Sequence, residues 1–227
     1  MTPFERLVRE SAGAKARFRD IPVIGRALDE GVPMDLYADY LGQAYHHVRH
    51  TCPLLAAALE HCGPGDKRLA TALREYIEEE EGHEAWILDD IAAVAGPDAV
   101  ARVVAYEGDA PVRALVGFMY DAIARRGPYA MLGMVHVLEG ISVELASRAA
   151  AAISERFGRT PEAGFSYMTS HGALDQEHVA FFEELINGIE DDKAIDLIID
   201  TANVVYELWG WMFERLDSPR GVKSHAA

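Results

Sequence analysis

Three metal-competent side chains recur at helical spacing late in the chain. His171, Asp175 and His178 occupy positions i, i+4 and i+7 of the segment Ser170–His178. On an α-helix these positions fall within about 60° of one another, so two imidazoles and a carboxylate would point the same way. A surface helix could carry the same three residues by chance. As a functional pattern, however, it predicts a metal site, because imidazole nitrogens and carboxylate oxygens are ligands of divalent metal ions.

A second pattern of this kind lies upstream. Glu80 and His83 follow a run of glutamates and form Glu-x-x-His, the i, i+3 arrangement with which helical bundles hold two metal ions between facing helices. An acidic run is more often a solvated helix face, so this pair alone is weak evidence. Together with the later trio it favours a metal site.

Glu139 is a single acid in the apolar segment from Met131 to Ile141. A buried acid without a partner is unfavourable, so a nearby cation would explain it, although Ser142 or a helix end could also satisfy the carboxylate. Its occurrence alongside the other two patterns, on a separate predicted helix, strengthens the metal hypothesis. Oxygen and nitrogen donors without thiolate suit Fe(II) or Mn(II), and the same donors also accept Zn(II).

The elements that must position these residues are all helical. Helical periodicity dominates the chain, and the alternating β-branched runs typical of strands are missing, so we predict an all-α fold. Gly-Pro punctuation separates the elements, and Pro53 is expected to kink the helix that contains it. Helices are expected over residues 2–14, 22–30, 34–61, 67–95, 98–106, 111–124, 129–157, 162–186 and 191–216.

Composition limits the function classes. With 227 residues, 50% of them hydrophobic, the chain can bury a large core, and we expect one helical domain over residues 1–217 followed by a disordered tail at 218–227. The net charge of −16 disfavours nucleic acid as a partner. No targeting segment or membrane-spanning apolar stretch is apparent, so we expect a cytoplasmic protein without membrane contact.

Cys52 and Cys62 would lie about 15 Å apart on one helix, which predicts two reduced thiols.

The three patterns, together with the sequence YLGQAYHHVRH at residues 40–50, resemble the heme-oxygenase-like fold group. This group includes the TenA thiaminases, the PqqC oxidases and the heme-oxygenase-like dimetal oxidases, and the resemblance spans roughly residues 20 to 215. It is strongest for the dimetal oxidases. It implies a multi-helix bundle whose metal ligands are Glu80, His83, Glu139, His171, Asp175 and His178.

Two departures from that pattern concern further ligands. Some members of the group carry the first carboxylate earlier in its helix, where this chain has Tyr76 and Leu73. Others supply a further Glu from the early helix, where this chain has His47 flanked by His46 and His50. The resemblance therefore suggests His47 as a seventh ligand. The TenA thiaminases are a poorer match, because their catalytic Cys belongs on the helix that here carries Glu139.

The function implied by the resemblance is that of a non-heme diiron oxidase or oxygenase. Such a protein binds two Fe(II) ions per chain, with Mn possible, and uses O2 as co-substrate to oxidise a small organic molecule by C–H abstraction, N-oxygenation or oxidative C–C cleavage. A homodimer is expected by analogy. The alternatives are a TenA-like or PqqC-like enzyme without a metal pair, and a non-catalytic helical protein that binds a ligand or metal. A ferritin-like carboxylate protein is disfavoured by His171 and Asp175.

Overall fold

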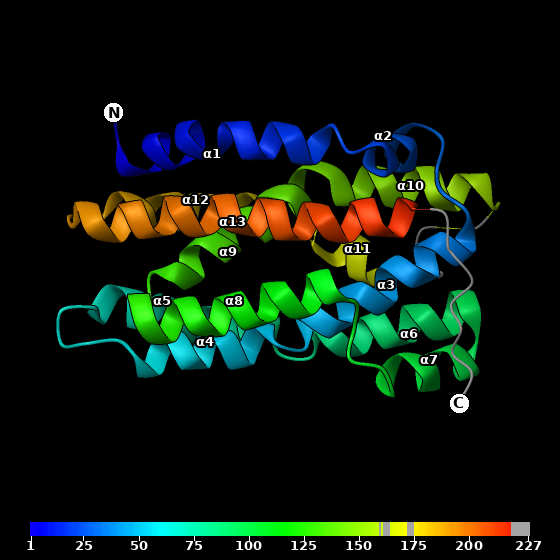
Figure 1. Cartoon of the computed structure of the whole chain (residues 1–227), viewed down its shortest axis with the longest axis horizontal. Helices are drawn as coiled ribbons and strands as arrows, with labels where there is room; N and C mark the ends of the chain where they lie inside the picture. The colour runs from blue at the N-terminus through cyan, green and yellow to red at the C-terminus, as the bar shows by residue number, and fades with distance from the viewer. Residues whose placement is uncertain (159, 161–163, 172–174, 219–227) are drawn as a thin grey trace.

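The computed structural model describes residues 1–158, 160, 164–171 and 175–218, and of residues 171–178 it describes no side chain. The described residues form helices and contain no strand, which confirms the all-α prediction (Figure 1). The first half of the chain forms α1 (Pro3–Arg19), α2 (Pro22–Asp29), α3 (Met34–Val48), α4 (Thr51–Glu60), α5 (Lys67–Glu80), α6 (His83–Ala95) and α7 (Pro97–Val104). The second half forms α8 (Ala110–Arg126), α9 (Ala130–Ile141), the π-helical turn η1 (Ser142–Ala146), α10 (Ser147–Arg156), α11 (Ser166–His171), α12 (Asp175–Asn187) and α13 (Asp192–Asp217).

Two helices that we predicted as continuous are broken. The helix expected over residues 34–61 is divided at Arg49 and His50 into α3 and α4. Pro53 does not kink it, because this proline lies in the first turn of α4, where a missing N–H removes no hydrogen bond. The helix expected over residues 67–95 is divided at Glu81 and Gly82, and Gly82 adopts a φ of +93°, which ends α5 and starts α6.

The helix expected over residues 162–186 also differs from the prediction. It begins at Ser166 rather than at 162, and its described parts are the two helices α11 and α12. Asp90 of α6 fixes the start of α11, since its carboxylate accepts hydrogen bonds from the backbone N–H of Ser166 at 3.0 Å and of Tyr167 at 2.9 Å. The Ser166 hydroxyl also donates to this carboxylate, at 2.8 Å. A buried carboxylate therefore satisfies N–H groups that α11 cannot satisfy itself.

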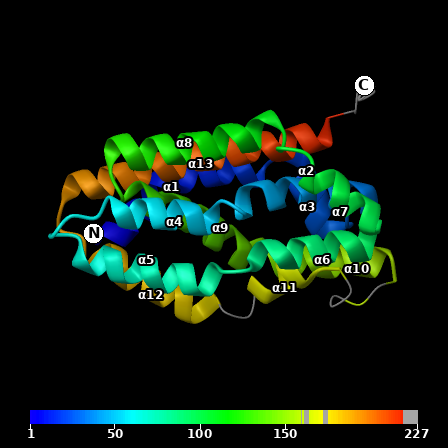
Figure 2. The same ribbon diagram turned by 90° about the horizontal axis from the view of Figure 1, so that it is seen from below.

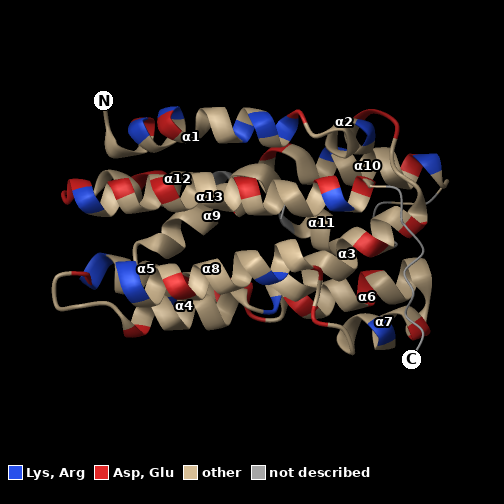
Figure 3. Cartoon of the chain, viewed as in Figure 1, with Lys and Arg blue, Asp and Glu red and all other residues tan. Residues whose placement is uncertain are grey.

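One long helix crosses the middle of the molecule. α9, η1 and α10 follow one another without interruption from Ala130 to Arg156, and the π turn of η1 lies near the midpoint. By length and composition alone this helix could cross a membrane, and half of its apolar window is buried inside the protein. Burial at the centre of a bundle accounts for that composition. In Figure 3 the α9 segment is almost free of charged residues.

The remaining helices pack around this long central helix (Figures 1 and 2). α13 lies along α9 and also contacts α1 and α8, whereas α3 packs on α6 and α4 on α5. Gly133 allows the close approach of α9 to α13, because a Cβ there would lie 2.6 Å from the carbonyl oxygen of Ile198. Cys52 and Cys62 are free thiols, as predicted. The helices thus hold α9, with Glu139 in its last turn, at the centre of the fold.

Candidate metal centre

A small cavity of about 50 Å³ lies where α3, α4, α5, α9, η1 and α11 meet. Three of the seven predicted ligands line it, namely His47 from α3, Glu80 from α5 and Glu139 from α9. Tyr76 and Tyr167 are further polar residues on its wall. Apolar side chains such as Met134 and Leu55 complete the lining. Carboxylates and an imidazole from helices far apart in the sequence therefore face one enclosed space.

His47 is the most deeply buried of the three. Its side chain is 1% exposed, and neither ring nitrogen has a hydrogen-bond partner among the described residues. Burial lowers the pKa of His47 to about 4, although the negative charge of Glu80 acts in the opposite direction. The imidazole is thus neutral at pH 7, which is the form that binds metal ions. A buried polar ring without a partner is rare and calls for a ligand or a water molecule.

We predicted that Glu80 and His83 lie on one face of a single helix. The structure places them on two different helices. Glu80 is the last residue of α5, His83 is the first of α6, and Gly82 turns the chain between them. The pair is nevertheless adjacent, since Nδ1 of His83 lies 2.9 Å from Oε2 of Glu80. His83 is buried and stacks on Trp86 with ring centroids 4.3 Å apart. Ligand imidazoles commonly donate one ring N–H to a carboxylate, which leaves the other nitrogen for a metal.

Glu139 is half-buried and faces the cavity, as the hypothesis of a buried acid required. The π turn starts three residues later at Ser142, which lines the same cavity. π turns inside α-helices often occur at functional sites, and nothing in the sequence predicted this one. The turn also directs Glu144 outward, where its carboxylate pairs with Lys15 and Arg19, each at 2.7 Å.

Tyr76 also lines this wall, although the metal-ligand motifs do not include it. Its hydroxyl is buried and has no hydrogen-bond partner among the residues described. Burial raises the pKa of Tyr76 strongly, and the nearby negative charges of Glu139 and Glu80 raise it further. The phenol therefore stays protonated beside two carboxylates. Its one sequence signal was its place one helical turn before Glu80.

The trio His171, Asp175 and His178 falls on the part of the chain whose side chains lie outside the described residues. His171 ends α11 and Asp175 begins α12, but the side chains of all three lie outside the described residues, and so does the backbone of residues 172–174 between them. Within the described part of the chain, no three His, Cys, Asp or Glu side chains gather closely enough to hold a metal ion. The trio therefore remains a prediction.

The two other histidines of α3 and its end do not line this cavity. His46 is buried and packs edge-on against Tyr45 and Tyr106. His50 has its Nδ1 3.2 Å from the hydroxyl of Tyr120. Of the three adjacent histidines, His47 is thus the one that faces Glu80 and Glu139.

The donors present suit a non-heme metal. One neutral imidazole and two carboxylates reach the cavity from three helices, with a second imidazole hydrogen-bonded to Glu80. Nitrogen and oxygen ligands of this kind fit Fe(II) or Mn(II), and the unpartnered ring of His47 is the observation that a metal would explain. Neither cysteine lines the cavity.

Solved structures share this fold at low sequence identity. A domain of unknown function with a heme oxygenase-like fold from Shewanella denitrificans aligns with a TM-score of 0.83 and 18% identity, over 95% of this chain and 92% of that one. A TenA homolog from Pseudomonas syringae pv. tomato gives 0.77 and 14%, covering 93% and 91%. Heme oxygenase-1 from the cyanobacterium Synechocystis, in complex with heme, gives 0.76 and 14%, covering 96% and 93%. These matches show a heme oxygenase-like fold.

Family assignment rests on the sequence itself. No functionally curated protein matches the chain. The family described as iron-containing redox enzymes matches residues 38–210, a segment that contains every predicted ligand from His47 to His178. The match covers most of the chain, and the chain therefore belongs to this family of iron-containing redox enzymes and has their heme oxygenase-like fold.

Proposed function

We propose that this protein is a non-heme diiron oxidase or oxygenase that uses O2 to oxidise a small organic substrate. The observation that carries the proposal is the buried, unpartnered imidazole of His47 in a cavity that also receives Glu80 and Glu139. Membership of a family of iron-containing redox enzymes supports it. When bound, ferrous ions would supply the electrons with which dioxygen is reduced.

His47, Glu80 and Glu139 would contribute to holding the two ions from α3, α5 and α9. His83 contributes from the start of α6, either through its second ring nitrogen or by fixing the carboxylate of Glu80. His171, Asp175 and His178 would complete the ligand set from α11 and α12. The neutral state of His47 at pH 7 keeps a lone pair ready for a metal without the loss of a proton.

The cavity wall would also control solvent and orientation. Met134, Leu138 and Leu55 give this space apolar walls, and electrostatic attraction between a carboxylate and a cation is stronger in apolar surroundings than at the surface. The hydroxyl of Tyr76 remains protonated and can donate a hydrogen bond toward the groups in the cavity. The fold likeness to a TenA homolog makes an enzyme of TenA type without a metal pair the second candidate.

Anaerobic loading with Fe(II), followed by rapid mixing with O2, tests the proposal. The wild type is expected to oxidise its iron in a fast phase with a transient absorbance change. His47→Ala and His178→Ala should lose this phase, whereas His61→Ala, which alters an exposed histidine at the end of α4, should retain it. Oxidation no faster than that of free Fe(II), in wild type and variants alike, would refute the proposal.

A further inference from the structure

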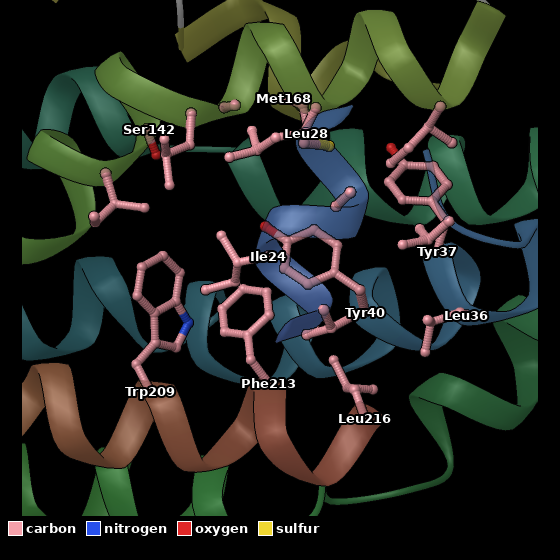
Figure 4. Close-up of a pocket in the computed structure, with 18 of the residues that line it drawn as sticks. Ile24, Leu28, Leu36, Tyr37, Tyr40, Ser142, Met168, Trp209, Phe213 and Leu216 are labelled. Carbon is pink, nitrogen blue, oxygen red and sulfur yellow. The ribbon is translucent and has the colours of Figure 1, made fainter. Parts of the chain in front are cut away.

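A second cavity shares the wall residue Ser142 with the candidate metal centre. Figure 4 shows the side chains that line this second cavity. The cavity has a volume of about 100 Å³ and is lined by the end of α1, by α2, α3, the long central helix and α11, and by the C-terminal part of α13. Aromatic rings from Phe18, Tyr37, Tyr40, Trp209 and Phe213 form much of its wall. Protein interiors are packed with few voids larger than a water molecule, so a space of this size is unusual for a core.

The two cavities adjoin at the π turn. Ser142, the first residue of η1, lines both of them. Trp209 lines the larger cavity, and its ring meets that of His47 edge to face, with centroids 6.1 Å apart and planes at 85°. A molecule in the larger cavity would therefore extend from the neighbourhood of His47 and Glu139.

The described lining of the larger cavity is mostly apolar. Among the residues that the structure describes, no Asp, Glu, Lys, Arg or His lines it. Among its few polar groups, the hydroxyl of Tyr37 already donates to the carbonyl oxygen of Gly164, at 3.0 Å. The indole N–H of Trp209, another wall residue, is buried and has no hydrogen-bond partner among the described residues, so it is available to one acceptor atom. A charged occupant would lose its hydration without compensation here. The described lining therefore favours an uncharged, mostly apolar occupant.

The mouth of this cavity lies near the ends of α2 and α13. Leu28, Leu36 and Leu216 on its wall are half-buried, whereas Ile141 and Trp209, near the candidate metal centre, are buried. Arg26 and Asp217 form an ion pair that joins α2 to α13 at this end. The cavity thus leads from a partly exposed apolar rim to Ser142 at the start of the π turn, beside the buried side chains of Ile141 and Trp209.

We propose that this cavity binds an uncharged alkyl or aryl arm of the substrate and holds the substrate's reacting end at Ser142, next to the candidate metal centre. This inference rests on the proposed oxidase function, because it assigns the cavity to that enzyme's substrate. The volume suits an arm of about four to six carbons, since a dry cavity of about 150 Å³ can bind benzene.

Calorimetric titration of the metal-free protein with 1-alkanols from butanol to nonanol tests the inference. Each added methylene buried in the cavity is expected to tighten binding about fourfold, until the cavity is full and the affinity levels off. Ala149→Leu places a larger side chain on the cavity wall from α10 and should shift the levelling-off to shorter alkanols. Ala146→Leu, also on the wall, serves as a second variant should the first fail to fold.

Ala151→Leu is the matched control, because Ala151 is exposed on the same helix. It should bind the series as the wild type does. Affinity that varies less than twofold across the series, or that is unchanged in both wall variants, would overturn the inference and leave iron uptake by the loaded protein unaffected. Chain-length-dependent binding by a protein that takes up no iron would instead overturn the proposed function, and with it the assignment of this cavity to a substrate.

Discussion

His83 and Glu80 face each other across a break between two helices. Nδ1 of His83 lies 2.9 Å from Oε2 of Glu80, although α5 ends at Glu80 and α6 begins at His83. Gly82, with φ at +93°, makes the turn that brings them together. On one continuous helix the two residues would be neighbours on the surface of a single element. Here the turn lets Glu80 line the cavity while His83 packs on Trp86.

Substitution of Gly82 is therefore expected to disturb this pair. Gly82→Ala meets no neighbouring atom, but a side chain at positive φ costs about 1 kcal/mol of unfolding free energy. Iron affinity should fall as well. Gly117→Ala in α8 is the control, because that glycine also has open space and lacks a positive φ. Urea denaturation and iron titration measure both effects; equal stability of the two variants would contradict the account.

Asp90 is expected to be essential for the position of α11. Asp90→Ala removes the acceptor of three hydrogen bonds from Ser166 and Tyr167, so it should lower the unfolding free energy by about 3 kcal/mol. Asp89→Ala, an exposed neighbour, should change it by less than about 0.5 kcal/mol. Chemical denaturation of both variants checks this, and similar small losses in the two would contradict the capping role.

The buried hydroxyl of Tyr76 predicts opposite effects on stability and on iron chemistry. Because this group has no partner among the described side chains, Tyr76→Phe should stabilise the metal-free protein by about 1 kcal/mol. The same variant should slow iron oxidation, since the phenol next to Glu80 and Glu139 is lost. Thermal denaturation without metal and stopped-flow with iron separate the two. A loss of stability would show that the hydroxyl already has a partner.

Acid sensitivity of the metal-free protein should depend on His136. Burial, followed by the charge of Lys15, lowers the pKa of His136 from 6.5 to about 4, and its Nε2 lies 3.2 Å from the hydroxyl of Ser11. Between pH 6.5 and 4 the unfolded chain therefore binds a proton that the folded protein does not, and stability falls as the pH falls. This residue should account for on the order of 2 kcal/mol of that loss.

The check is a series of denaturation curves between pH 7 and 4. His136→Gln should show a shallower decline than the wild type, while His61→Gln, at an exposed position, should follow the wild type. Parallel declines in all three proteins would mean that His136 titrates normally in the folded state.

Several features of the site could be predicted because each leaves a local signal. An acid in an apolar helix indicated Glu139, and the structure places it on the cavity wall. The prediction that Glu80 and His83 are neighbours was correct, but its reason was wrong. It assumed one continuous helix, whereas Gly82 ends α5 between them. Nonlocal features left no such signal. Asp90 caps a helix 76 residues later, and the contact depends on how α6 and α11 pack.

The central claim is that Glu139 and its neighbours bind two metal ions, and iron stoichiometry tests it most directly. Metal-free protein is titrated with Fe(II) under anaerobic conditions, and bound iron is counted per chain. The wild type and Glu155→Gln, an exposed change on α10, are expected to bind about two ions each, and Glu139→Gln clearly fewer. Negligible binding by all three proteins, or equal binding by Glu139→Gln and the wild type, would contradict the account.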